Sequence, residues 1–288
     1  MTEARIGVIG GSGLYNIEGL TGIEEVKPET PFGEPSENII LGELGGVPLA
    51  FLPRHGRGHR LTPSEIPVRA NIYALKSLGV EQIISVSAVG SLKENLHPVD
   101  MVIPDQIIDR TKSRVNTFFG DGLVAHLSFA DPFCPVLSSV LQQAASESGA
   151  AVHMGGTYIC MEGPLFSTKA ESNLYRSWGA DIIGMTALPE AKLAREAEIC
   201  YTMLACVTDY DTWHETEESV TVEIAIGNLL KNVATAKDIL SRLVTRIPGL
   251  RECECSTALE QGIITAPELI PDRIKKDLDL LIGKYIKE

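Results

Sequence analysis

The sequence lacks the features of several classes of protein. No stretch approaches the roughly eighteen consecutive apolar residues of a membrane span, the start MTEARIGVIGG has no signal-peptide core, and no Asn-x-Ser/Thr sequon occurs. The 25 basic residues are outnumbered by 38 acidic ones, and the net charge of -13 repels nucleic acid and anionic membranes. Six cysteines in 288 residues are too few for a disulfide scaffold. We therefore expect a folded cytoplasmic protein that binds neither nucleic acid nor membrane.

Short β-branched runs alternate with helical periodicity along the chain. Strands are predicted over residues 6–9, 38–44, 47–52, 83–89, 101–108, 157–161, 181–185 and 200–208. Helices are predicted over residues 69–78, 137–148, 167–178, 190–198, 222–247 and 274–285. This order favours a layered α/β fold. Because no change of composition separates the halves, we expect residues 1–288 to form a single domain with a helical extension over about 250–288.

A glycine-rich turn follows the first predicted strand. In Gly10-Gly11-Ser12-Gly13 the missing side chains allow backbone N–H groups to converge on an anion, and Ser12 adds a hydroxyl. The spacing matches neither the dinucleotide-binding pattern nor the P-loop pattern. A tight turn and an anion site therefore remain equally open.

Segment 53–60, PRHGRGHR, concentrates three arginines and two histidines in an acidic protein. A planar guanidinium there can fork onto a phosphate, which predicts an oxyanion site. The alternative is that surface arginines balance nearby carboxylates. A zinc site at His55 and His59 is disfavoured, because the glycines oppose a helix and no third ligand is near.

Small or polar residues follow three later strands, in segment 85–91 (SVSAVGS), at Met185 with Thr186, and at Asp209 with Asp211. At the carboxyl edge of a sheet such groups can meet a ligand, although the serines also suit close helix packing. Asp209 and Asp211 point the same way if the strand persists, which indicates base recognition or proton handling. A turn is the competing interpretation of this pair.

Five strings in order, GGSGLY, PRHGRGH, SAVGSL, MEGPLFSTKAES and WGADIIGMTALPEAKLAREAEICYTMLACVTDYDTW, carry a family resemblance. Over about the first 250 residues the chain resembles the 5'-methylthioadenosine phosphorylases of the purine nucleoside phosphorylase superfamily. The resemblance implies a three-layer α/β/α sandwich with a central mixed sheet, assembled as a homotrimer or a dimer of trimers. It implies reversible phosphorolysis of S-methyl-5'-thioadenosine to adenine and 5-methylthioribose 1-phosphate, with phosphate as co-substrate and no metal or organic cofactor.

The resemblance also implies roles for individual residues. The expected phosphate-binding residues are Ser12, Arg54, His55, Ser87, Ala88 and Thr186. The expected substrate contacts are Met185 at the ribose, Asp209, Tyr210 and Asp211 at the purine, Phe166 stacked on the base, and His126 reaching the 5' region of its own or of a neighbouring subunit. Ser167 is expected to define the edge of the base, and Val222 and Ile226 to line the methylthio pocket. Ser12 and Ser87 stand where many relatives carry threonine, which keeps the hydroxyl.

Phosphorolysis explains these assignments chemically. The reaction needs an anion site under the sugar, and the departing purine needs a positioned proton donor or hydrogen bond. The sugar passes through an oxocarbenium-like state that phosphate attacks, so no protein nucleophile is required. Asp209 and His55 are the catalytic candidates, with Asp209 supporting protonation at N7.

Two other functions remain open at this stage. A 6-oxopurine nucleoside or methylthioinosine phosphorylase would share nearly all these strings, but such family members tend to place asparagine rather than aspartate at the base. A non-catalytic purine-binding protein is the more distant alternative, because nothing obvious in the pattern of site residues is missing.

Cys253 and Cys255 lie one residue apart near the C-terminus. They are similar to a C-x-C pair in some thermostable members of the family. Unpaired thiols are nevertheless the default in a reducing cytosol. The sequence therefore leaves the redox state and the role of this pair open.

Overall fold

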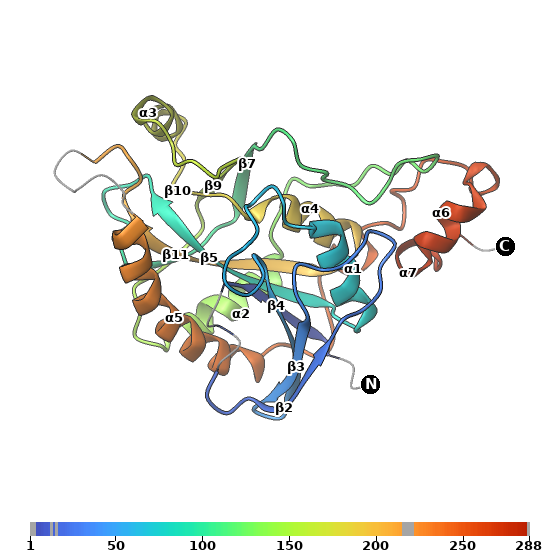
Figure 1. Cartoon of the computed structure of the whole chain (residues 1–288), viewed down its shortest axis with the longest axis horizontal. Helices are drawn as coiled ribbons and strands as arrows, with labels where there is room; N and C mark the ends of the chain where they lie inside the picture. Colours follow the sequence, from blue (N-terminus) through green and yellow to red (C-terminus); the bar gives the residue numbers. More distant parts are fainter. Residues whose placement is uncertain (1–3, 12–13, 15–16, 215–221, 287–288) are drawn as a thin grey trace.

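The computed structural model describes residues 4–11, 14, 17–214 and 222–286, with the backbone alone for 222–225 (Figure 1). The described residues form one eleven-stranded mixed sheet with helices around it. Its strands are β1 (Ile6–Gly10), β2 (Thr21–Val26), β3 (Ile39–Leu44), β4 (Val47–Pro53), β5 (Gln82–Ser91), β6 (Met101–Ile103), β7 (Gln106–Arg110), β8 (Val152–Met154), β9 (Thr157–Met161), β10 (Ile182–Gly184) and β11 (Cys200–Asp209). The helices are α1 (Val68–Ser77), α2 (Pro135–Ser146), α3 (Lys169–Ser177), α4 (Ala187–Glu196), α5 (Val222–Val244), α6 (Asp272–Asp277) and α7 (Asp279–Ile282), with short helical turns η1 (Glu254–Thr257) and η2 (Pro267–Leu269).

Four parallel strands form the centre of the sheet. β1 pairs with β4 and β5, and β5 pairs along its length with β11, each in parallel register. These strands are mostly buried and rich in β-branched and other apolar residues, as expected where helices cover both faces. Because parallel strands share one direction, Gly10, Pro53, Ser91 and Asp209 mark a common carboxyl edge of the sheet.

A fifth strand, β10, lies beside β5 near this carboxyl edge and runs in the opposite direction. β10 is antiparallel to β5, with Ile183 opposite Gly90. The chain that leaves β10 therefore runs back beside β5. This reversal places Met185 and Thr186 near Ser87, although about a hundred residues separate them in the sequence.

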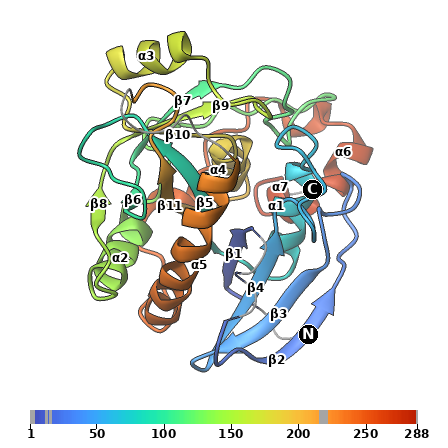
Figure 2. The same cartoon turned by 60° about the vertical axis from the view of Figure 1, so that its left-hand side comes forward.

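Helices cover both faces of the sheet, which confirms the predicted three-layer sandwich. Figure 2 shows α2 and α5 on one side, with α1, α6 and α7 on the other. α2 and α5 contribute Leu141 and Ile239 to the core on their side, whereas α1 and α4 contribute Ile72 and Leu193 to the opposite core. The apolar residues of the last helices join that second core. In the part of the chain that the structure describes, no helix has the length and apolar character needed to cross a membrane.

The structure corrects two predicted elements. The strand predicted over 101–108 is wrong, because Pro104 lacks the N–H that would continue one ladder. β6 and β7 on either side of it pair with different strands, β6 with β11 and β8, and β7 with β9. The last helix is likewise divided at Leu278, whose ψ of 11° departs from the helical value. The sequence pattern also missed β2, an exposed edge strand, and β8, a strand of 3 residues.

Candidate active site

The arginines of segment 53–60 do not act as one unit. Arg57 pairs with Glu25, and Arg60 pairs with Glu37 at 3.3 Å, near the surface of the protein. These ion pairs confirm, for Arg57 and Arg60, the alternative interpretation that surface arginines balance nearby carboxylates. Arg54 differs, because only 2% of its surface is exposed.

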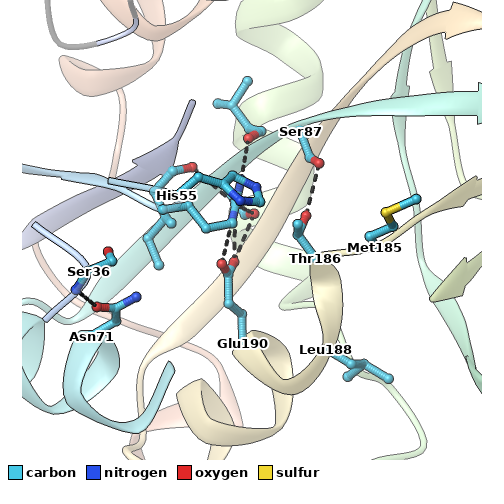
Figure 3. Close-up of polar contacts among 12 residues, drawn as sticks. Ser36, His55, Asn71, Ser87, Met185, Thr186, Leu188 and Glu190 are labelled. Carbon is cyan, nitrogen blue, oxygen red and sulfur yellow. Dashed lines mark hydrogen bonds and ion pairs between the residues drawn. The ribbon is translucent and has the colours of Figure 1, made fainter. Parts of the chain in front are cut away.

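Arg54 forms a buried ion pair with Glu190 of α4, on which the dashed contacts in Figure 3 converge. Nε donates to Glu190, while Nη2 donates to Glu190 at 3.2 Å and to the Ser85 hydroxyl at 2.7 Å. Nη1 donates to the Val86 carbonyl oxygen at 3.0 Å. Burial alone would lower the pKa of Arg54, but the Glu190 carboxylate outweighs it and raises that pKa. Among the described residues Nη1 binds this single acceptor, so its second hydrogen can serve a ligand.

His55 follows Arg54 and is held in one tautomer. Its Nδ1 lies 2.8 Å from the Leu61 carbonyl oxygen, so Nδ1 carries the proton of the neutral ring and Nε2 keeps a lone pair. The ring stacks on His59 with centroids 4.1 Å apart. Burial and the neighbouring Arg54 charge lower the pKa of His55 from 6.5 to about 4. At neutral pH this ring is therefore an acceptor at Nε2.

Two hydroxyls from separate segments meet in the same region. Ser87 Oγ of β5 lies 2.9 Å from Thr186 Oγ1, just before α4 (Figure 3). Ala88, the next residue of β5, is exposed at the sheet edge. Met185 is half-buried against Gly163, where a Cβ atom would lie 2.5 Å from the Met185 sulfur. Glycine at that position allows the Met185 side chain to lie beside the two hydroxyls.

Asp209 and Asp211 lie at the end of β11 against Gly90 of β5. A Cβ atom on Gly90 would lie 2.9 Å from Asp209 Oδ1 and 3.3 Å from Asp211 Cβ. Asp211 has a φ of 50°, and its N–H donates to Asp209 Oδ1 at 2.8 Å. The strand therefore does not persist through Asp211, and the turn that was the competing interpretation of this pair is observed. This turn still holds both carboxyl groups at the sheet edge.

Burial shifts the titration of both carboxyl groups in the same direction. Burial raises the pKa of Asp209, although the Thr208 hydroxyl opposes this by donating to Oδ2 at 2.7 Å. Burial also raises the pKa of Asp211, whose Oδ2 has no hydrogen-bond partner among the described residues. Asn228 of α5 fixes the strand end by donating to the Thr208 carbonyl oxygen at 2.7 Å. A carboxyl group that keeps its proton closer to neutral pH can donate it to a ligand.

The other predicted purine contacts lie in the segments next to the aspartates. Ser167 is buried, and its hydroxyl counters the rise in the pKa of Asp211. Phe166 beside it is 46% exposed, so its ring is accessible. Tyr210 stacks on His214 with centroids 4.6 Å apart. The structure thus brings Ser167 and Tyr210 to the carboxyl groups and leaves the Phe166 ring open to solvent.

The remaining predicted site residues are Ser12, Val222, Ile226 and His126. Ser12 and the side chain of Val222 lie outside the described residues. Ile226 lies further along α5 and is 50% exposed. His126 is exposed on the loop after β7, where its N–H donates to the Gly262 carbonyl oxygen at 2.8 Å. Figure 1 shows this loop running towards α6, away from the arrowhead of β5.

Glu190 is a buried charge that the sequence interpretation missed. Besides Arg54, it accepts from the Tyr201 hydroxyl at 3.0 Å and from the Ser85 hydroxyl at 3.2 Å. Its only signal in the sequence was a carboxylate at the start of a largely apolar helical string. Glu190 thereby connects α4 with β5 and β11 beneath the candidate site.

Arg114 is the second missed residue. Its side chain is 4% exposed, and it donates to the Leu188 carbonyl oxygen at 2.7 Å and to the Met161 carbonyl oxygen at 3.3 Å. It also donates to the carbonyl oxygen of Met185. This guanidinium holds the chain on both sides of Met185 and Thr186, and the polar loop around it carried no sequence signal.

The chain is similar to known phosphorylases. A family model described as the phosphorylase superfamily matches residues 5–245. A relative from Geobacter sulfurreducens named S-methyl-5'-thioadenosine phosphorylase is 59% identical and aligns over 99% of this chain and 100% of its own. A solved methylthioadenosine phosphorylase from an Antarctic soil metagenomic library is 55% identical, covers 98% of this chain and 99% of its own, and gives a TM-score of 0.94. Methylthioadenosine phosphorylase from Schistosoma mansoni in complex with adenine is 34% identical over 96% of this chain and 97% of its own, with a TM-score of 0.81.

Replacing only one member of the buried ion pair should be strongly destabilising. Arg54→Met leaves the Glu190 carboxylate buried without its main partner and should lower the free energy of unfolding by about 3–5 kcal/mol. Adding Glu190→Leu removes the unpaired charge and should restore part of that loss. Urea unfolding of the parent, both single variants and the double variant measures the coupling. If the change in unfolding free energy of the double variant equals the sum of the changes in the two single variants, the two residues are not coupled.

His55 should remain neutral down to acidic pH. The unfolded chain takes up a proton on this ring near pH 6.5, whereas the folded chain does so only near pH 4, so acidification through this window favours unfolding. Histidine ring NMR titration should show a His55 midpoint close to 4 and the Nδ1–H tautomer at pH 7. His59→Ala identifies the neighbouring signal. A His55 midpoint near 6.5 would refute the buried environment.

Proposed function

The chain belongs to the S-methyl-5'-thioadenosine phosphorylases of the phosphorylase superfamily, and from this membership we propose that it catalyses the reversible phosphorolysis of S-methyl-5'-thioadenosine. The products are adenine and 5-methylthioribose 1-phosphate. One observation carries the proposal: β5 holds the Ser87 hydroxyl and, three residues later, the glycine against which Asp209 packs. Three strand residues span about 10 Å, which leaves room for a ribose between a phosphate and a purine.

In this proposal the phosphate lies at the Arg54 end of the site. The second Nη1 hydrogen of Arg54, the hydroxyls of Ser87 and Thr186 and the backbone N–H of Ala88 supply donors to it. Ser12 supplies a further hydroxyl from the glycine-rich turn. His55 contributes the opposite function, because its Nε2 lone pair accepts the hydrogen of a protonated phosphate oxygen. The phosphate is thereby oriented with an unprotonated oxygen towards the sugar.

The purine lies at the other end, against Asp209. A protonated Asp209 donates towards N7 and so stabilises the charge that develops on the departing base, while the ionised form accepts from the 6-amino group. Asp211 and Tyr210 also face the purine, and Ser167 defines the edge of the base. The exposed Phe166 ring stacks on the base. Met185 packs against the ribose. Phosphate itself is the nucleophile, so the proposed reaction uses a co-substrate and no cofactor.

The 5' substituent is proposed to lie at the start of α5. Val222 and Ile226 are four residues apart and share one face of the helix, and the Ile226 side chain is half exposed. Asn228 of the same helix donates to the Thr208 carbonyl oxygen, which holds this part of α5 beside the end of β11. An apolar face favours a methylthio group and disfavours a 5'-hydroxyl that would lose water there.

We further propose a cytoplasmic homotrimer or dimer of trimers in which the whole chain acts as one domain. One sheet runs through the described chain from β1 to β11, and the C-terminal helices share a core with α1 and α4. His126 supports the oligomer, because it lies beside the C-terminal segment and away from the site of its own chain. It would then reach the 5' region of a neighbouring subunit.

Product analysis tests the proposed reaction directly. The full-length protein is incubated with methylthioadenosine, methylthioinosine or adenosine, each with and without phosphate. We expect free adenine from methylthioadenosine only when phosphate is present. Preferential cleavage of methylthioinosine would assign a 6-oxopurine phosphorylase instead, and binding without cleavage would assign a purine-binding protein.

Asp209→Asn should shift the preference from 6-amino towards 6-oxo purines. The new amide donates to O6, whereas one mispaired polar contact to the 6-amino group costs about 1–3 kcal/mol. The fold should tolerate the change, because the Thr208 hydroxyl also reaches the Val89 carbonyl oxygen at 3.2 Å. The ratio of kcat/KM for methylthioadenosine and methylthioinosine measures the shift, with Asp238→Asn on the surface of α5 as the control. An unchanged ratio would remove Asp209 from base recognition.

A further inference from the structure

Four cysteines from distant parts of the chain meet at the end of the sheet opposite to the candidate site. Their sulfur atoms all lie within 4.8 Å of one another, and we call them the four-cysteine cluster: Cys134, Cys200, Cys253 and Cys255. Three of them are at most 3% exposed, and Cys253 is partly exposed. The apolar side chains of Leu137 and Ile247 pack around them. Four sulfur ligands are thus gathered in an apolar, nearly closed space.

We propose that the four-cysteine cluster binds one zinc ion as a structural site. Zinc takes four thiolates in a tetrahedron at about 2.3 Å, which puts the sulfurs about 3.8 Å apart. The sulfurs lie within 4.8 Å of one another and the Cys200 and Cys253 sulfurs are 3.2 Å apart, so the observed separations lie on both sides of the tetrahedral value. Binding forms four Zn–S bonds, and the four thiols release their protons to solvent.

A disulfide would explain the positions of only two of the four sulfur atoms. It joins two sulfurs at about 2.05 Å and has no need of a third or a fourth nearby. Cys200 Sγ and Cys253 Sγ lie 3.2 Å apart, and the other two sulfurs lie within 4.8 Å of this pair. Mutual proximity of all four sulfurs is the geometry that a tetrahedral ion requires.

The surroundings of Cys134 suit a negatively charged thiolate. Cys134 is the N-cap of α2, a helix of 12 residues, and its sulfur accepts from the Leu137 N–H at 3.5 Å. The positive end of the helix dipole and this N–H both favour a thiolate at Cys134. The partly exposed Cys253 provides the route by which an ion enters.

The position of the cluster assigns the ion a role in stability. Cys200 begins β11, Cys134 precedes α2, and the other two cysteines lie in the segment that follows α5. The ion would therefore fix the C-terminal segment to the sheet. Asp209 lies nine residues from Cys200 along β11, about 30 Å away, so the proposed ion leaves the cofactor-free reaction unchanged.

Metal analysis of the full chain tests the proposal. The parent, Cys253→Ser and the control Cys206→Ala are expressed with zinc and purified under reducing conditions. Cys206 is buried in β11 like Cys200 but lies outside the cluster. We expect about one zinc per chain in the parent and the control, and loss of most of it in Cys253→Ser. Cobalt reconstitution should give the strong absorption of a tetrahedral thiolate site in the parent and in Cys206→Ala, and not in Cys253→Ser.

Stability and thiol counts separate the remaining outcomes. Chelation should lower the melting temperature of the parent by about 5 °C or more and leave that of Cys253→Ser unchanged, with turnover at moderate temperature retained in both. After denaturation with chelator and without reductant, six reactive thiols per chain should be counted, matching the six cysteines. Fewer thiols would assign a disulfide and overturn the zinc site. Iron in place of zinc, or no metal with six thiols, would overturn it as well.

Discussion

The buried ion pair between Arg54 and Glu190 determines the position of most other groups at the candidate site. A guanidinium with 2% exposure keeps its charge only because a carboxylate and several oxygen acceptors surround it. Those partners come from β5 and α4, and Tyr201 of β11 also binds the Glu190 carboxylate. His55 is the residue after Arg54, and Thr186 lies one turn before Glu190. Fixing the pair therefore fixes both neighbours, so the proposed phosphate donors are arranged before any ligand arrives.

The two ends of the site differ in how they handle protons. The Arg54 charge and burial keep His55 neutral, with a lone pair directed away from its carbonyl partner. At the other end, burial favours the protonated form of Asp209. One end thus accepts a hydrogen and the other can give one. This separation of titratable groups by their environments is a general mark of acid–base chemistry, and here it matches a reaction in which phosphate enters opposite the departing base.

Local sequence patterns predicted the residues that follow strands, since the carboxyl ends of parallel strands must share one edge. Ser87, Thr186 and Asp209 were found in this way. The partner of Arg54 could not be found, because Glu190 lies 136 residues further along the chain and only tertiary packing joins them. The turn at Asp211 was an open alternative, and its packing against Gly90 joins two segments that lie far apart in the sequence. The sequence pattern predicts which groups reach the edge, whereas long-range contacts decide how they are held there.

β11 places two different kinds of chemistry at its two ends. Its residues are almost all buried and pair with β5 along the whole strand, so it acts as a rigid spacer between Cys200 and Asp209. About 30 Å of strand separates the four-cysteine cluster from the carboxyl groups, and the interaction between two charges falls with distance, so charge at the cluster has little effect on these groups. Changes at the cysteine end can therefore alter how firmly the C-terminal segment is held while the pKa values at the aspartate end stay the same. The fold consequently allows stability and catalysis to vary independently along a single strand.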